Sequence, residues 1–268
     1  MRSAGPPHWL SSHPQVNGVY HLGRAEPAAE MAALYLRVRK RERRLYDDDA
    51  VARLPAVSAE DPHAREWAAR AESARRLCSY IAAHAAHADI LELGCGNGWL
   101  SHRLALATRG FVVGIDVNLV ELEQAARVFG TCANLAFAWA DVFDNGLPAS
   151  VCDVVVMAAS LQYFADVSEL LQRLLGLLRP GGEIHILDSP LYHPHQVEAA
   201  RERSRGYYAR QGVPQMASFY HHHTWPELLA FAPTILYDPA RPGVRLRRFL
   251  FRRPVSPFPW LRIRRPRS

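Results

Sequence analysis

From residue 90 onward, the chain alternates between short apolar runs and stretches whose apolar positions recur at helical spacing. The first kind predicts buried strands, and the second predicts amphipathic helices between them. We expect strands at Ile90–Leu93, Phe111–Asp116, Leu135–Ala140, Val151–Ala158, Glu183–Asp188, Thr234–Tyr237 and Trp260–Arg264. We expect helices at Trp99–Thr108, Leu119–Phe129, Val167–Leu178 and Thr224–Phe231. This alternation is typical of a doubly wound α/β fold, in which helices cover both faces of a mostly parallel sheet.

The first 84 residues have a different pattern. Residues 1–25 are rich in Pro, Gly, His and Ser, which predicts a loose arm. Helical spacing of apolar residues predicts one helix within Pro27–Leu45 and a second at Pro62–His84, joined by a linker at Pro55–Pro62. Asp61 is the expected N-cap of the second helix, because a proline at the first helical position follows it.

These patterns divide the chain into an N-terminal arm with a helix, residues 1–60, and a main domain, residues 61–268. Within the main domain, residues 191–223 interrupt the strand and helix rhythm with a helix at Gln196–Arg210 and a loop rich in His and Tyr. The interruption follows the fifth strand at the carboxyl edge of the sheet, where α/β proteins bind ligands. We therefore expect residues 191–223 to cover a substrate.

The most informative segment is ILELGCGNGWL, residues 90–100. A strand ends at Leu93, three glycines follow at Gly94, Gly96 and Gly98, and a helix opens at about Trp99. Glycines let the backbone turn sharply and approach a ligand with no Cβ in the way. The new helix directs its free N–H groups and partial positive charge toward the same place. The segment therefore predicts a site for a nucleotide-like ligand.

The spacing of the glycines narrows the choice of ligand. The dinucleotide fingerprint G-x-G-x-x-G requires a third glycine where this chain has Trp99, and no G-K-[ST] follows as in a phosphate-binding loop. Glu92, just before the first glycine, would repel a pyrophosphate. The same carboxylate would attract the ammonium and sulfonium groups of S-adenosylmethionine.

Two further acids follow the next two strands. Asp116 ends the second strand, 22 residues beyond Gly94, where a carboxylate can accept hydrogen bonds from both ribose hydroxyls. Asp141 ends the third strand, where it could accept a hydrogen bond from the exocyclic amine of adenine, with the Val142 N–H reaching a ring nitrogen. Glycines and acids thus follow successive strands in one order.

These motifs resemble the class I S-adenosylmethionine-dependent methyltransferases. ELGCGNG resembles the first motif of that family, GID its second-strand acid, AD its third, and LRPGGEIHILD the fifth-strand turn of the branch that methylates small molecules. The resemblance covers Ile90–Asp188 and weakens toward Arg264. It implies a Rossmann-like, seven-stranded, mostly parallel sheet whose last strand, Trp260–Arg264, is antiparallel, with an N-terminal helical extension.

The resemblance also implies roles for residues that would hold S-adenosylmethionine. It places Glu92 and Gly94 at the methionine end, Gly96 and Gly98 in the turn, Asp116 at the ribose, Val117, Asp141 and Val142 at the adenine, and Ser160 near the methyl donor. Segments in residues 35–77 are similar to a bacterial group of uncharacterised methyltransferases, which makes the N-terminal helices part of the working unit. Arg70 is then a candidate partner for the methionine carboxylate.

The acceptor and the chemistry at its reacting atom are not readable from the sequence. A general base is needed only if the acceptor must lose a proton near neutral pH. Tyr163, His193, His195 and His221 follow the strand ends or lie in the insertion, and they are our candidates for the catalytic residues. We expect no metal site, because the adjacent residues His221–His223 would not share one face of a regular element.

We therefore predict an enzyme that transfers a methyl group from S-adenosylmethionine to a small or medium-sized acceptor. Two alternatives stay open. One is a non-catalytic module that binds the cofactor, and the other is an NAD-dependent oxidoreductase, which Trp99 disfavours.

Composition adds limits on location and partners. The 268 residues include four cysteines without a CxxC pair, no apolar leader, and no apolar run long enough to span a bilayer. We expect a soluble cytoplasmic protein. The net charge of +6 is concentrated in ten arginines between Arg241 and Arg267, which form a solvated surface or a patch for an acidic substrate, lipid or RNA. A nucleic-acid partner is not favoured, and the oligomeric state is not readable.

Overall fold

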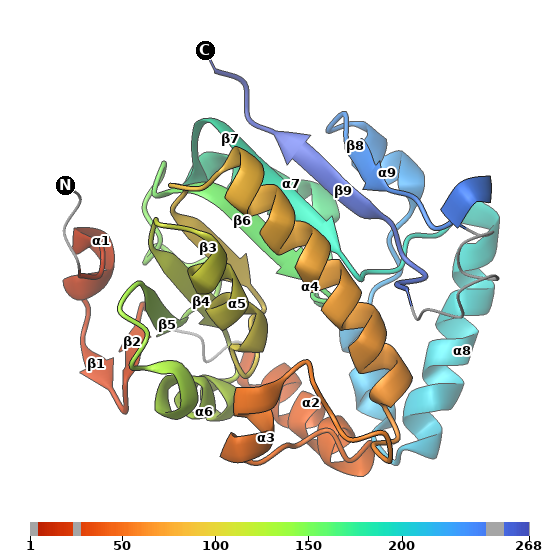
Figure 1. Cartoon of the computed structure of the whole chain (residues 1–268). Coiled ribbons are helices and arrows are strands. Elements are labelled where there is room, and N and C mark those ends of the chain that lie inside the picture. The colour runs from red at the N-terminus through yellow and green to blue at the C-terminus, as the bar shows by residue number, and fades with distance from the viewer. Residues whose placement is uncertain (1–4, 24–27, 245–254, 268) are drawn as a thin grey trace.

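One central sheet organises the computed structural model, which describes residues 5–23, 28–244 and 255–267 (Figure 1). The strands are β1 Gln15–Val16, β2 Val19–His21, β3 Ile90–Leu93, β4 Val112–Asp116, β5 Leu135–Trp139, β6 Cys152–Ala158, β7 Leu178–Leu187, β8 Thr234–Tyr237 and β9 Trp260–Arg264. Their spatial order is β1-β2-β5-β4-β3-β6-β7-β9-β8. The pairs from β2 to β7 are parallel, and those of β1 with β2, β7 with β9 and β9 with β8 are antiparallel.

All seven predicted strands are present, with bounds that shift by a few residues, and the last strand is antiparallel as expected. The expectation of seven strands and a loose arm is wrong for the described residues, because β1 and β2 extend the sheet beside β5. Val19 and Leu22 are fully buried there. The turn between β1 and β2 is Asn17–Gly18, with both residues at positive φ. This dipeptide is a strong hairpin signal in a sequence.

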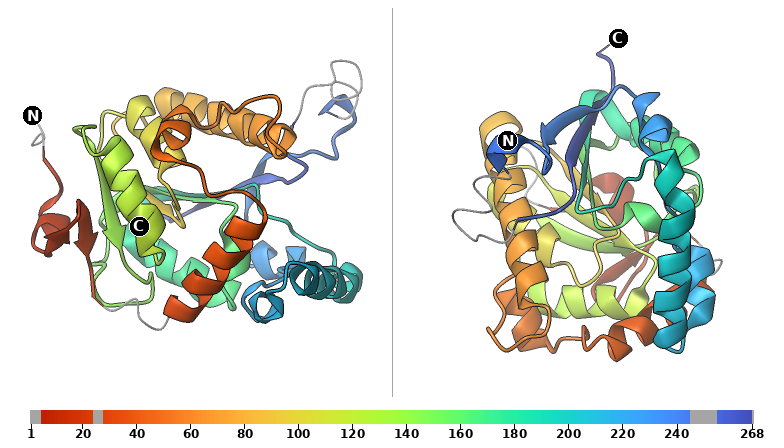
Figure 2. Two further views of the ribbon diagram at one scale, coloured as in Figure 1. Left: turned by 90° about the horizontal axis from the view of Figure 1, so that it is seen from below. Right: turned by 90° about the vertical axis from the view of Figure 1, so that its right-hand side faces the viewer.

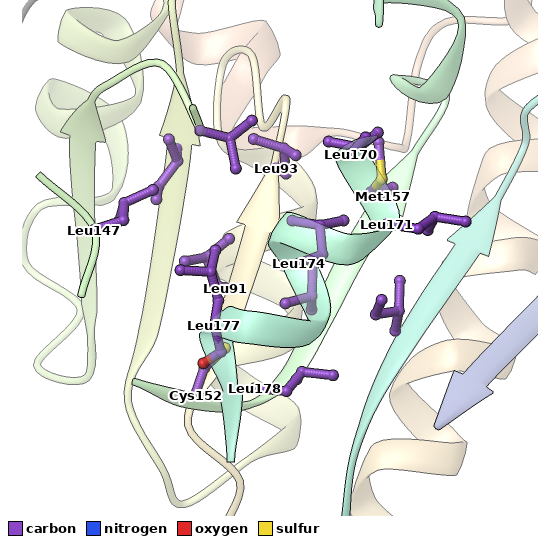
Figure 3. Packing of buried hydrophobic residues seen from close by; sticks show 14 of the residues in the cluster. Leu91, Leu93, Leu147, Cys152, Met157, Leu170, Leu171, Leu174, Leu177 and Leu178 are labelled. Atoms are coloured by element: carbon purple, nitrogen blue, oxygen red, sulfur yellow. The ribbon is translucent and has the colours of Figure 1, made fainter. Parts of the chain in front are cut away.

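Helices cover both faces of the sheet. They are α1 His8–Ser11, α2 Ala29–Arg41, α3 Asp48–Arg53, α4 Ala64–His84, α5 Trp99–Ala107, α6 Leu119–Phe129, α7 Val167–Leu177, α8 Val197–Arg210 and α9 Trp225–Leu229. Helices α4, α5 and α6 pack on one face, and α7 and α9 on the other (Figure 2). Figure 3 shows leucines of α7 against Leu91, Leu93 and Met157 of the strands. Their strand neighbours Ile90 and Val156 point to the opposite core, as alternation requires.

A third layer crosses the carboxyl ends of the strands. It consists of α2, at the bottom of Figure 1, together with α8 and the 3₁₀ segment Pro214–Phe219 of the insertion. Leu34 and Val38 of α2 pack against Tyr208, Val213 and Met216 in a small cluster separate from the two main cores. The layer therefore has its own apolar core. The predicted helix at Gln196–Arg210 is confirmed as α8.

The segment before α4 differs from its prediction. The helix begins at Ala64 and not at Pro62, and His63 is its N-cap residue. The Asp61 carboxylate accepts a hydrogen bond from the His63 N–H at 2.7 Å, outside the helix, and a second from the Tyr46 hydroxyl at 3.0 Å. Both contacts of the carboxylate lie outside α4, so the Asp61 side chain does not cap the helix.

Gly98 sets how closely α5 approaches the sheet. Its φ is +75°, and a Cβ there would lie 2.6 Å from the Phe137 ring and 2.8 Å from the Ala125 Cβ. Both distances are shorter than any real carbon contact. A side chain at this position would therefore separate α5 from β5 and α6.

We expect Gly98→Ala to lower the free energy of unfolding by about 1–3 kcal/mol, because it adds overpacking to a strained φ. Gly176→Ala in α7 is the matched control, since nothing lies within 4 Å of its Cβ position. That change should raise the stability by roughly 0.5–1 kcal/mol. Urea unfolding checks both variants, and an unaltered midpoint for Gly98→Ala would contradict the packing argument.

Candidate functional site

The turn after β3 is the centre of the site. Gly94 and Gly96 have φ values of +76° and +51°, which side chains rarely adopt. A Cβ on Gly94 would lie 2.5 Å from the Ser160 Cβ, so only glycine fits between the ends of β3 and β6. The Ser160 hydroxyl donates to the Leu93 carbonyl at 2.8 Å and ties the two strand ends together.

Asp116 lies directly beside this turn. Its carboxylate accepts hydrogen bonds from the backbone N–H groups of Gly96 and Asn118, each at 2.8 Å. Burial raises the pKa of Asp116, although backbone N–H groups that bond to the carboxylate lower it. Each oxygen still has acceptor capacity for a ligand hydroxyl, because a carboxylate offers about four lone-pair sites.

Glu92 lies beneath the turn in β3. It is 2% exposed, and it accepts a hydrogen bond from the Ser101 hydroxyl of α5. Burial raises its pKa to about 8; the Ser101 bond opposes this shift, and the nearby charge of Asp116 adds to it. At neutral pH the side chain is therefore mostly protonated unless a cation is close to it.

Two hollows flank the turn and share Tyr35, Gly94, Gly96 and Ala159. The polar hollow, of about 680 Å³, is lined among others by Arg39, Arg70, Glu92, Glu121 and Asp188. The apolar hollow, of about 960 Å³, is lined among others by Asp116, Val117, Asp141, Val142, Ser160 and Tyr163. The structure thus brings every residue predicted to contact the cofactor into one cleft, except Gly98, which supports the turn from behind.

Arg70 belongs to an ion-pair cluster on the wall of the polar hollow. It lies 3.0 Å from Glu66, which also pairs with Arg44. Burial by itself would raise the pKa of Glu66. The hydrogen bond from Arg44 and the charges of Arg70 and Arg44 outweigh that effect, so the pKa falls to about 2. Arg39 and Arg44 share Glu42 in the same way, at 3.3 and 3.1 Å. These three arginines therefore face two carboxylates that lie outside the lining of the hollow.

The four candidate catalytic residues lie in three different places. Tyr163 lines the apolar hollow, and its ring meets that of Tyr35 edge-on at 5.6 Å. His193 and His195 are exposed, stacked on each other at 5.7 Å, and outside the lining of both hollows. His221 lines a separate polar hollow next to α8. Within residues 5–23, 28–244 and 255–267, no His, Cys, Asp and Glu side chains cluster as metal ligands would.

Sequence reasoning missed Tyr35, Arg39 and Glu121 as parts of this site. Tyr35 and Arg39 come from α2, where the apolar spacing indicated only a core-facing stripe. Glu121 comes from the first turn of α6, three residues after the N-cap Asn118, a place that usually indicates capping. Burial raises the pKa of Glu121 to about 7, with a contribution from Asp116, while Arg39 opposes the shift. No spacing rule connects these residues to the turn, because the contacts are tertiary.

Part of the chain matches known methyltransferases. A family model described as "Methyltransferase domain" matches residues 90–182. An uncharacterized methyltransferase of Mycobacterium tuberculosis is 35% identical over 100 residues, which is 37% of this chain and 49% of that protein. The 27-O-demethylrifamycin SV methyltransferase of Amycolatopsis mediterranei is 32% identical over 120 residues, 43% of this chain and 44% of that protein. The chain spans about half the length of the curated relatives it matches.

Solved structures extend the likeness beyond residue 182. A geranyl diphosphate methyltransferase in complex with S-adenosylmethionine has a TM-score of 0.53 at 14% identity, covering 83% of this chain and 95% of that chain. A geranyl diphosphate C-methyltransferase from Streptomyces coelicolor also scores 0.53, at 15% identity and over 88% of this chain and 98% of that one. At such identities the likeness concerns the fold alone. Residues 90–182 therefore match a methyltransferase domain, and the fold of the chain is that of the class I methyltransferases.

Proposed function

We propose that the protein is an enzyme that transfers a methyl group from S-adenosylmethionine to a small or medium-sized acceptor. The observation that carries this proposal is the glycine turn with three acids around it, of which Glu92 is buried and Asp116 and Glu121 are half-buried. A crevice with no Cβ at Gly94 and with Glu92, Asp116 and Glu121 nearby suits a ligand that combines a nucleoside with positive charge. A pyrophosphate would meet repulsion there.

The residues of the cleft fit the parts of S-adenosylmethionine. Asp116 has acceptor capacity for ribose hydroxyls, and Asp141 with the Val142 N–H would hold the adenine in the apolar hollow. Glu92 and Gly94 would bind the methionine end in the polar hollow. Arg70 would pair with the methionine carboxylate, because its carboxylate partner Glu66 is shared with Arg44.

The cofactor supplies an electrophilic methyl carbon on a sulfonium, so the chain mainly aligns the reactants and excludes water. Among the candidate catalytic residues we favour Tyr163, which lines the cleft beside Ser160. Burial raises the pKa of the Tyr163 phenol, and this keeps it protonated at neutral pH. We therefore propose that Tyr163 donates a hydrogen bond that orients the acceptor. His193, His195 and His221 stay candidates for a base only if the third layer, made of α2, α8 and Pro214–Phe219, rearranges.

We propose that the third layer selects the acceptor. Met31 and Tyr35 of α2 line the apolar hollow, and residues 191–223 pack against α2. The N-terminal part, residues 1–60, would thus act with the main domain. The relatives are named for unlike acceptors, 27-O-demethylrifamycin SV, trans-aconitate and geranyl diphosphate, so their names assign no acceptor to this chain.

We also propose a location and limits on other partners. All four cysteines are free, which fits a reducing cytoplasmic compartment. No helix in residues 5–23, 28–244 and 255–267 has the length and apolar character to span a bilayer. Five of the ten C-terminal arginines lie outside the described residues, and nucleic acid stays a partner that we do not favour.

The central experiment is equilibrium binding of S-adenosylhomocysteine, followed by transfer of a labelled methyl group from S-adenosylmethionine to a cell extract. We expect binding in the micromolar range and a labelled small molecule. Binding without transfer would favour a non-catalytic module. Tighter binding of a nicotinamide cofactor than of S-adenosylhomocysteine would favour an oxidoreductase, and no binding at all would remove the proposal.

Replacement of Arg70 tests the methionine end separately. Arg70→Met should weaken S-adenosylhomocysteine binding about 10–100-fold, because a charge-assisted hydrogen bond is lost. Binding of 5′-methylthioadenosine, which lacks the carboxylate, should stay unchanged. Arg75→Met on the same helix is the control, since Arg75 is exposed and pairs with Glu72, away from the cleft lining. Equal losses for both ligands would show that Arg70 acts on folding and not on the carboxylate.

The buried acids predict how cofactor affinity depends on pH. Without ligand, the pKa of Glu92 is about 8 and that of Glu121 about 7, so both are partly protonated at neutral pH. A bound cation favours the carboxylates, so binding should release protons, and affinity should rise as pH increases from 6 to about 7.5, below the range in which the ligand's own ammonium titrates. The limit is about tenfold per pH unit for each released proton. Calorimetry in two buffers of different ionisation enthalpy measures the release, and an affinity that falls with rising pH would contradict it.

A further inference from the structure

The insertion forms a polar hollow of its own outside the cofactor cleft, between α8 and the loop that follows Pro214–Phe219. Its volume is about 650 Å³, and we call it the insertion hollow. Ala165 belongs to its lining and also to that of the apolar hollow, so the two hollows share a rim. Most of the other lining residues are polar or charged, among them Arg201 and Arg205 of α8, Tyr220 and His221 of the loop, and Glu227 of α9.

The two arginines of α8 are available to a ligand. Arg201 and Arg205 are four residues apart, so they lie on the same side of the helix. Arg201 lies 3.7 Å from Glu198, and Arg205 lies 2.7 Å from Glu202 and 3.3 Å from Glu198. All four side chains are more than half exposed, and neither glutamate lines the hollow. Such surface ion pairs contribute little stability, so either guanidinium can turn to an anion at a small cost.

The three consecutive histidines of the loop differ in what their rings do. The buried ring of His222 bonds to the Ser204 hydroxyl at 2.9 Å, and the buried ring of His223 donates to the Leu161 carbonyl at 3.2 Å. The half-buried ring of His221 makes no hydrogen bond to any residue in 5–23, 28–244 and 255–267. Two histidines thus hold the loop in place, and the third keeps its ring nitrogens free for a ligand in the hollow.

The donors around the hollow fit one kind of anion. They come from a helix and from a loop, so they would surround a ligand with oxygens pointing in several directions, as phosphate has. Burial raises the pKa of Tyr220, which keeps its phenol protonated as a further donor. The Glu227 carboxylate is the opposing group, but it accepts hydrogen bonds from the N–H and hydroxyl of Thr224. The hollow therefore favours a phosphate group over a cation.

We propose that Arg201, Arg205 and His221 bind a phosphate group of a small phosphorylated molecule, at a site separate from the cofactor cleft. The phosphate belongs either to the acceptor, which would reach the apolar hollow over Ala165, or to a second molecule. This inference goes beyond the proposed function, because phosphate binding in the insertion hollow does not require methyl transfer.

Protonation of His221 would add a positive charge to the site. Arg201 and Arg205 face it from α8, His222–His223 adjoin it, and Glu227 faces it from α9. Burial lowers the pKa of His221, and its neighbours His223 and Arg201 lower it further, so the ring is neutral at pH 7.5 without a ligand. A bound anion favours the protonated ring, so binding takes up a proton and affinity rises as pH falls.

The first test is binding of inorganic phosphate to the full chain, measured by calorimetry at constant ionic strength. We expect saturable binding that Arg201→Met and Arg205→Met each weaken about tenfold, because a charge-assisted hydrogen bond is lost. Arg203→Met is the matched control, since Arg203 is exposed on the same helix but outside the lining of the hollow, and it should change the affinity less than about twofold. Equal thermal midpoints show that the variants are folded.

The role of His221 is tested with sulfate, because the charge of phosphate itself changes near neutral pH. The affinity of the wild type for sulfate should rise as pH falls from 7.5 to 5.5. His221→Gln keeps an N–H donor but cannot take up a proton, so its affinity should rise less over that range. No saturable phosphate binding by the wild type, or equal losses for Arg203→Met and Arg201→Met, would overturn the site and leave the proposed function intact.

Transfer of a labelled methyl group to a cell extract then identifies the source of the phosphate. A labelled product that phosphatase makes less acidic, and whose formation Arg201→Met slows at low but not at high extract concentration, assigns the phosphate to the acceptor. A labelled product without phosphate assigns the site to a second molecule. A protein that binds phosphate in this hollow but transfers no methyl group would remove the proposed function and leave this inference.

Discussion

The hydrogen bond from the Gly96 N–H to the Asp116 carboxylate, at 2.8 Å, joins the two sequence features on which the site depends. It ties the turn after β3 to the end of β4, and it forms because these strands are parallel neighbours whose carboxyl ends meet at one edge. The turn can approach the acid only because Gly94 and Gly96 adopt positive φ values without a side chain. The cleft, its two hollows and the packing of α5 all follow from this arrangement.

The electrostatics of the cleft are divided between its two ends. Three acids, the buried Glu92 and the half-buried Asp116 and Glu121, lie around the turn and have raised pKa values, because desolvation penalises their charged forms. Arginines form the outer wall of the polar hollow, where Glu42 and Glu66 partly neutralise them. A site of this kind favours a positively charged ligand group near the turn and a negatively charged one at the rim of the cleft. The zwitterionic methionine end of the proposed cofactor has both charges.

Much of the fold could be predicted because local patterns carried it. The alternation of apolar runs predicted β3 to β9 and the helices between them, and the GID and AD motifs predicted acids at two strand ends. The N-terminal hairpin was missed although Asn17–Gly18 is a local turn signal, because Pro- and His-rich flanks suggested a loose arm. The start of α4 was misplaced because the Asp61 side chain bonds outside the helix, a choice that a capping pattern does not reveal.

By itself, the sequence determined the succession of strands and helices along the chain from residue 90, the glycine turn and the acids that follow it. Each of these is set by residues close together in the chain. Only the tertiary structure decided what covers the cleft. Tyr35 and Glu121 come from helices that lie far from the turn in sequence, and they meet it because α2 packs on the insertion and α6 on the sheet. The exposure of His193 and His195 was decided in the same way. Long-range packing follows from the sum of many buried contacts, and no short motif encodes that sum.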